Sequence, residues 1–140
     1  RRVKKINKII KKILNYKNDL EFISKINYYC NFILANDSFI KKLNKQYKKN
    51  NKATDVLTFV SEINQKNRKK EKHCDIVFSI ETINNYIIDN NIDFYDHLSH
   101  LIIHSFLHIN GFMHNSVKNE LIMQSKEIRI LKKLNIDNPY

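Results

Sequence analysis

The segment from His104 to His114 constrains the fold of this chain more than any other. Its pattern is H-x-x-x-H-x-x-G-x-x-H, and Gly111 is the only glycine in 140 residues. Histidines four apart on a helix lie on one face, one turn apart. A glycine three residues after the second histidine is typical of a left-handed helix end. We therefore expect a helix through His108, a turn at Gly111, and a return of His114 toward the histidine pair.

Three imidazoles that converge in this way predict a metal site. Three histidine ligands leave one tetrahedral position of zinc open, as in catalytic rather than structural sites. The helix also carries His97 and His100 on the same stripe, but that stripe is roughly 16 Å long, too long for one ion. Only the last two histidines of the helix are within reach of the residue that follows the turn. His104, His108 and His114 are thus predicted to bind one Zn²⁺ ion. His97 and His100 are the less favoured ligands, and His100 is a candidate to orient one.

The residue after the first histidine indicates whether the site is suited to hydrolyse peptides. Metzincin metalloproteases share this spacing, but there a glutamate follows the first histidine and acts as general base. Ser105 occupies that position here. A serine hydroxyl cannot accept a proton from the attacking water at neutral pH. Peptide hydrolysis is therefore the least favoured interpretation.

The charge of the chain indicates an acidic partner. Lys and Arg number 25 against 14 Asp and Glu, a net charge of +11. For a protein this basic, the usual partner is nucleic acid. Residues 3–15 place apolar side chains at helical spacing with lysines between them, either as an RNA-facing surface or as a solvated face. We see no secretory signal and no apolar run near the ~18 residues of a membrane span. We therefore expect a cytoplasmic protein with Cys30 and Cys74 as free thiols.

The order of the predicted elements indicates an α+β fold. We expect a small mixed β-sheet of about four strands packed with about five helices, with residues 1–140 as a single domain. The metal site is expected on a helix of the C-terminal half and the turn after it. Two of the strands, 54–60 and 74–80, are joined by a charged loop and are expected to pair antiparallel. The predicted helices are 3–15, 39–48, 81–90, 94–110 and 116–134, with a short helical piece at 19–25; a further strand is 26–35, and the loops are 48–53 and 64–72.

Four segments, in this order along the chain, resemble the signature of the YbeY family of bacterial metal-dependent endoribonucleases. Residues 43–48 and 54–59 resemble L-N-x-x-Y-R and T-D-V-L-S-F. Residues 74–79 resemble G-D-I-x-I-S, and residues 104–114 resemble H-G-x-L-H-L-x-G-Y-D-H. Met123 and Glu127 stand where the family has a methionine and a glutamate in its last helix.

This resemblance implies a single-strand-specific, zinc-dependent endoribonuclease. Its implied role is rRNA processing, including maturation of the 16S rRNA 3′ end, and ribosome quality control. The implied partners are single-stranded RNA, the small ribosomal subunit and an assembly GTPase, with no membrane and no DNA. The alternative is a non-catalytic, zinc-containing ribosome assembly factor.

The resemblance also makes Lys48 a candidate catalytic residue, because it stands where the family has an arginine. Its charge would stabilise the negative charge that builds on the phosphate. Lysine keeps the charge of arginine but lacks the planar fork that binds phosphate at two points. The sequence offers no obvious general base, and either water or a 2′-hydroxyl could be the nucleophile.

Other positions differ from the family signature or have an open role. Asn44 and Asp75 either shape the cleft or satisfy backbone groups near strand ends, and Thr54-Asp55 is expected to be a turn or cap. Residues that replace others of the signature are Ser105 and Cys74 for glycine, Met113 for aspartate, and Ala53 and Val60 for proline.

Overall fold

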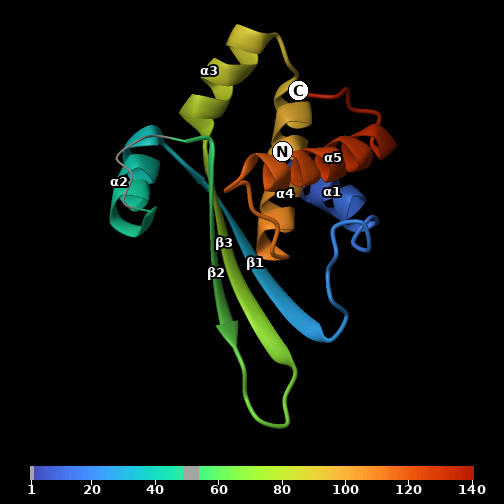
Figure 1. Ribbon diagram of the computed structural model, residues 1–140. Coiled ribbons are helices and arrows are strands. Elements are labelled where there is room, and N and C mark those ends of the chain that lie inside the picture. The colour runs from blue at the N-terminus through green and yellow to red at the C-terminus, as the bar shows by residue number, and fades with distance from the viewer. Residues whose placement is uncertain (1, 49–53) are drawn as a thin grey trace. The chain divides into compact units, whose positions relative to one another are not determined.

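The computed structural model describes residues 2–48 and 54–140, apart from the Lys48 side chain. The described residues form two compact units, one of residues up to 22 with 95–140 and one of residues 23–94. The α+β class is confirmed, whereas the predicted loop 48–53 lies almost wholly outside the described residues. The elements are α1 (Arg2–Leu14), β1 (Ile26–Ala35), α2 (Asp37–Lys48), β2 (Val56–Ile63), β3 (Lys70–Ser79), α3 (Ile80–Asn90), α4 (Phe94–Ile109) and α5 (Val117–Lys133) (Figure 1).

The sheet belongs to the second unit and is mixed. Its order is β1-β3-β2, with β1 parallel to β3 and β2 antiparallel to β3. The antiparallel prediction for the last two strands is confirmed, and the described residues contain three strands where about four were expected. Cys30 and Cys74 are opposite residues of β1 and β3, and neither forms a disulfide.

In the hairpin of β2 and β3, the loop is shorter than the loop predicted from the sequence, and both strands extend further toward it. β3 begins at Lys70, inside the loop predicted over 64–72. The reason is charge pairing across the strands: Glu62 contacts the ammonium groups of Lys70 at 3.0 Å and Lys72 at 3.6 Å. Opposite charges on facing strands favour pairing where neither sequence segment is apolar.

Side-chain caps fix where α2 and α3 begin. Asn36 Oδ1 accepts a hydrogen bond from the Phe39 amide at 2.9 Å, as an N-cap residue does. Asp37 links the two helix starts, because its carboxylate accepts hydrogen bonds from the hydroxyls of Ser79 and Thr82. Below these caps, a buried cluster of Ile40, Leu57 and Val77 connects α2 to the sheet.

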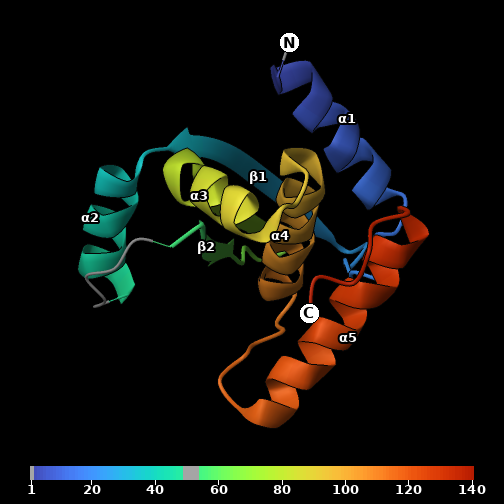
Figure 2. The ribbon, with the colours of Figure 1, turned by 90° about the horizontal axis from the view of Figure 1, so that it is seen from above.

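The first unit is helical and is built around α4. Ten of the sixteen residues of α4 are buried, which explains why the helix is apolar on most of its circumference. α1 and α5 lie beside it (Figure 2), and the Phe22 ring meets the Phe106 ring edge-on at 5.3 Å between centroids. Among the described residues, no helix is long and apolar enough to cross a lipid bilayer.

The short helical piece predicted at 19–25 is wrong. After α1 the chain makes hydrogen-bonded turns, such as Leu20 N to Tyr16 O at 3.1 Å and Glu21 N to Asn18 O at 3.1 Å. Glu21 then has a φ of +60°, which a continuing right-handed helix does not allow. The turns still bury Leu20 completely, so the apolar spacing there reflects burial without a helix.

Candidate metal centre

The turn after α4 is the left-handed helix end that Gly111 predicts. The Phe112 amide donates to the Leu107 carbonyl at 3.0 Å, and the Gly111 amide donates to the His108 carbonyl at 3.1 Å. Together these two bonds form a Schellman motif, which requires a positive φ at its glycine position. Gly111 has a φ of +97°. The motif ends the helix at Ile109, directly after His108, and sends the chain back toward the histidine pair.

The same turn orients the His108 ring. His108 Nδ1 lies 2.8 Å from the Phe112 carbonyl oxygen. A carbonyl oxygen only accepts hydrogen bonds, so Nδ1 carries the proton and Nε2 keeps its lone pair. Burial and, to a lesser extent, the nearby His104 together lower the pKa of the His108 ring to about 4. His108 is therefore a neutral imidazole at physiological pH, as a metal ligand must be.

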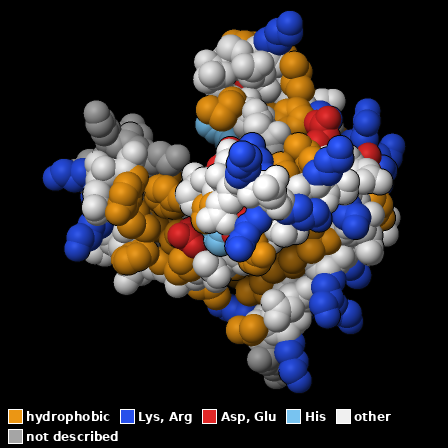
Figure 3. Space-filling view, turned by 90° about the horizontal axis from the view of Figure 1, so that it is seen from below, with side chains coloured by type: hydrophobic (Ala, Val, Ile, Leu, Met, Phe, Trp, Pro, Cys, Tyr) orange, Lys and Arg blue, Asp and Glu red, His pale blue; other side chains and the backbone are white. Residues whose placement is uncertain are grey.

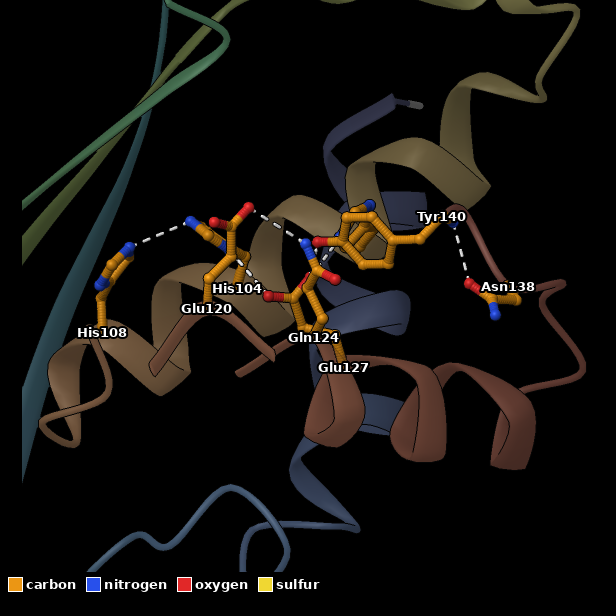
Figure 4. A network of polar contacts seen from close by, with 8 residues as sticks. His104, His108, Glu120, Gln124, Glu127, Asn138 and Tyr140 are labelled. Carbon is orange, nitrogen blue, oxygen red and sulfur yellow. Dashed lines mark hydrogen bonds and ion pairs between the residues drawn. The ribbon is translucent and has the colours of Figure 1, made fainter. Parts of the chain in front are cut away.

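The His104 ring is held by Glu127 of α5, whose side chain is only 1% exposed. His104 Nδ1 lies 2.9 Å from Glu127 Oε2. The other carboxylate oxygen, Oε1, accepts a hydrogen bond at 2.5 Å from the Tyr140 hydroxyl (Figure 4). It accepts another, also at 2.5 Å, from His100 Nε2. Burial would raise the pKa of Glu127, but these hydrogen bonds outweigh it and lower the pKa to about 2. Because the carboxylate is ionised, His104 donates from Nδ1 and presents the lone pair of Nε2.

The ring nitrogens of three histidines lie close to one another. The Nε2 atoms of His104 and His108 are 3.0 Å apart, and one nitrogen from each of His104, His108 and His114 falls within 4.8 Å of the others. Two lone pairs face each other at 3.0 Å, an arrangement that a shared cation stabilises. Two nitrogens bound to one zinc ion lie at most about 4 Å apart, since each bond is about 2.0–2.1 Å. The three histidines could therefore hold one metal ion, with only a small movement of the exposed His114.

The other histidines of α4 do not join this group. His100 binds Glu127 and lies 3.1 Å from the Tyr140 hydroxyl, so it supports the carboxylate that orients His104. His97 is buried, and its ring meets the His100 ring edge-on. The assignment of His104, His108 and His114 as ligands stays a prediction, with a geometry that suits it.

The remaining candidate residues from the sequence lie outside this group of histidines. Ser105 is completely buried, and its hydroxyl has no hydrogen-bond partner among the described residues, so it cannot act as a base on a substrate. Asp75 accepts a hydrogen bond from Asn31 Nδ2 at 3.1 Å across the β1–β3 pair. Asn44 is buried in α2. Lys48 is the last residue of α2, and its role stays a prediction because its side chain lies outside the described part.

The sequence of the whole chain matches a known family. The family model described as Endoribonuclease YbeY matches residues 1–135. The chain belongs to the YbeY family. Among YbeY-family relatives, Endoribonuclease YbeY of Ehrlichia chaffeensis is 37% identical over 145 residues, which cover 99% of this chain and 88% of that protein. Endoribonuclease YbeY of Colwellia psychrerythraea is 38% identical over 107 residues, which cover 76% of this chain and 68% of that protein.

A solved structure supports the same fold. The solution structure of TM1509 from Thermotoga maritima aligns with a TM-score of 0.56 and 24% identity, and it covers 91% of this chain and 82% of that chain. At this level of identity the likeness concerns the fold alone. The resemblance read from the four sequence motifs is confirmed by the family match.

Two residues of the centre were missed when the residues alone were considered. The Phe112 carbonyl gives no sequence signal, because every residue has a carbonyl group. Tyr140 lies 13 residues after Glu127 and reaches it through the segment that follows α5. The sequence indicates Glu127 only through the family signature, because its contact with His104 spans 23 residues.

Proposed function

We propose that the chain is a zinc-dependent endoribonuclease that cleaves single-stranded ribosomal RNA, with His104, His108 and His114 as the ligands of one zinc ion. The observation that carries this proposal is the pair of Nε2 atoms 3.0 Å apart, each on a ring whose Nδ1–H is already bound. The name of the relatives, Endoribonuclease YbeY, supports RNA as the substrate. A net charge of +11 suits a polyanion, and the face seen in Figure 3 carries many Lys and Arg side chains and few Asp and Glu.

Each part of the centre has a distinct task in this proposal. A zinc ion would lower the pKa of a water molecule or polarise a phosphoryl oxygen. Glu127 and the Phe112 carbonyl hold two of the three rings in the tautomer and orientation that bind a cation, as partners behind metal ligands generally do. Lys48 would place its positive charge on the phosphate that is attacked.

The biological setting follows from the substrate. We place the reaction in the cytoplasm, in rRNA maturation that includes the 3′ end of 16S rRNA, and in ribosome quality control. The small ribosomal subunit and an assembly GTPase are the expected partners. Co-sedimentation of the tagged protein with small subunits, at salt concentrations that preserve ribosomes, tests this setting separately from the chemistry.

The central experiment measures cleavage of single-stranded RNA by purified protein, together with its zinc content. We expect about one zinc per chain, cleavage that a chelator stops and added zinc restores, and loss of both zinc and cleavage in His108→Ala. His73→Ala is the matched control, because His73 is an exposed histidine on β3. Cleavage that survives both chelation and His108→Ala would refute the proposal.

A second function rests on two departures from the family signature. Lys48 replaces an arginine, and Met113, which is 52% exposed, replaces an aspartate beside His114. A protein that lost its activity but kept its ribosome contacts would be a zinc-containing assembly factor. It would bind small subunits, cleave no RNA, and keep this binding in His108→Ala provided that the variant stays folded.

A further inference from the structure

A hollow of about 430 Å³ lies within the first unit, apart from the metal centre. It is lined by the side of α1, the first turns of α4 and the segment after α5, which approach one another in Figure 2. The lining combines positive charge with aromatic rings. Its charged and aromatic residues are Lys5, Lys12, Lys133, Asp96, Tyr16 and Tyr95.

Contacts within the hollow hold cations against rings. The Lys5 ammonium lies 4.2 Å from the centre of the Tyr95 ring, and the Lys133 ammonium lies 5.4 Å from the centre of the Tyr16 ring. Lys133 also binds Asp19 at 2.7 Å. Tyr16 and Tyr95 are half-buried. Lysines beside aromatic rings are the combination that proteins use for single-stranded nucleic acid, with the backbone on the cations and the bases on the rings.

The helix that forms one wall adds to this charge. α1 contains six basic residues and no acidic residue along its whole length. Most of its apolar side is occupied: Ile6 and Ile13 are buried, Ile9 and Ile10 are half-buried, and Val3 and Leu14 at the two ends are exposed. An amphipathic basic helix that binds membranes needs its apolar face for the lipid, whereas RNA needs only the charged face. The packing of α1 therefore favours a nucleic acid over a lipid surface.

We propose that this hollow is a second RNA-binding site, which holds two backbone phosphates, one on Lys5 and one on Lys12, and stacks a base on Tyr16 or Tyr95. The class of ligand is single-stranded RNA at nucleotides away from the bond that is cleaved. The proposal rests on the proposed function for the identity of the nucleic acid. It goes beyond that function because it assigns binding to a place whose lining includes none of the residues of the metal centre.

The geometry of α4 separates the two sites. Ser99 lines the hollow, and His108 belongs to the metal centre. Nine residues separate them, which at 100° and 1.5 Å per residue puts them on opposite sides of the helix and roughly 14 Å apart along it. A strand that reaches both sites must therefore be several nucleotides long, and a trinucleotide at the metal centre cannot also occupy the hollow.

The test compares binding of a 12-nucleotide and a 3-nucleotide single-stranded RNA to the metal-loaded protein, using phosphorothioate RNA that resists cleavage. For the longer RNA, we expect Lys5→Gln/Lys12→Gln to reduce the slope of log affinity against log salt by about 1.4, since each phosphate contact on a single strand contributes about 0.7. Tyr16→Leu/Tyr95→Leu should weaken binding roughly tenfold through lost stacking, with the slope unchanged. Neither pair should change binding of the trinucleotide.

The matched control is Lys25→Gln/Lys66→Gln, which removes the same charge from two exposed positions of the other unit. We expect it to leave the slope within about 0.3 of the unmodified protein. Equal losses in both lysine pairs, no loss in Lys5→Gln/Lys12→Gln, or lysine-dependent binding to anionic vesicles without binding to RNA would each overturn the site. If the protein cleaves no RNA but the slope changes as expected, the proposed catalysis fails and the second site stands.

Discussion

The metal centre and the end of α2 offer the two parts of the proposed chemistry in contrasting surroundings. At the metal centre, a carboxylate that is 1% exposed and a backbone carbonyl hold two rings in place. Along α2, the described lysine side chains and Tyr47 are exposed, and among the described side chains burial is confined to Ile40 and Asn44. The comparison teaches that the candidate cation site is built by burial and hydrogen bonds, whereas the charge proposed for the phosphate, on Lys48, would come from the end of a helix whose other lysines are exposed.

The largest effect is expected when the buried carboxylate loses its charge. Glu127→Gln removes the negative charge of the carboxylate that orients His104. The same carboxylate accepts hydrogen bonds from His100 and Tyr140. Because partners of this kind hold metal ligands in orientation, zinc affinity should fall about 10- to 100-fold. Competition with a fluorescent chelator measures the affinity directly.

Glu120→Gln is the control for that experiment. Glu120 lies on the same helix and contacts Gln124 at 3.3 Å (Figure 4), and the substitution removes the same charge at an exposed position. We expect its zinc affinity to stay within twofold of the unmodified protein. If the two variants lose affinity equally, the comparison fails, because long-range charge rather than the Glu127–His104 contact would be responsible.

The next effect concerns Lys48 and should appear in the rate rather than in zinc content. Lys48→Ala should lower kcat/KM for RNA cleavage about tenfold, since one charge on the phosphate is lost. Lys48→Arg should equal or exceed the unmodified rate, because the guanidinium binds phosphate at two points. An unchanged rate in Lys48→Ala would remove Lys48 from the proposed mechanism and leave the metal centre intact.

A smaller effect, on the free energy of unfolding, is expected at Gly111, in the turn between α4 and His114. An alanine at position 111 would meet no atom within 4 Å, so any cost of Gly111→Ala comes from its φ of +97°. That strain should lower the free energy of unfolding by about 1–2 kcal/mol. Gly111→Asn should cost less, because asparagine tolerates left-handed backbone better. Chemical denaturation of the three proteins measures both differences, and a fully stable Gly111→Ala would contradict the argument.

The smallest effect is a pH dependence of the metal-free protein. The pKa of His108 is about 4 when folded and about 6.5 in an unfolded chain. Below pH 6.5 the unfolded state takes up the proton first, so the free energy of unfolding falls as the pH drops from 6.5 toward 4. Between pH 7 and 5.5 the loss should be under about 1 kcal/mol, because the ring is partly exposed. His108→Gln should reduce this slope in denaturation experiments, and an unchanged slope would exclude His108 as its source.

Much of the centre could be predicted because its signals are local. The four-residue spacing of His104 and His108 needs only a helix, and the return of the chain needs only Gly111. The parallel pairing of β1 with β3 could not be predicted in the same way, because its partners, such as Asn31 and Asp75, are 44 residues apart. The helix expected at 19–25 failed for a related reason, since Leu20 is buried although Glu21, with a φ of +60°, breaks the helical backbone.

α4 carries residues of the hollow at its beginning and two histidines of the metal centre at its end, so the helix is a rigid spacer between them. One residue inserted between Ser99 and His104 would turn the later histidines by 100° and advance them by 1.5 Å. The spacing of the two sites, and with it the number of nucleotides between an anchored base and the cut, is therefore set by the residue count of a single helix.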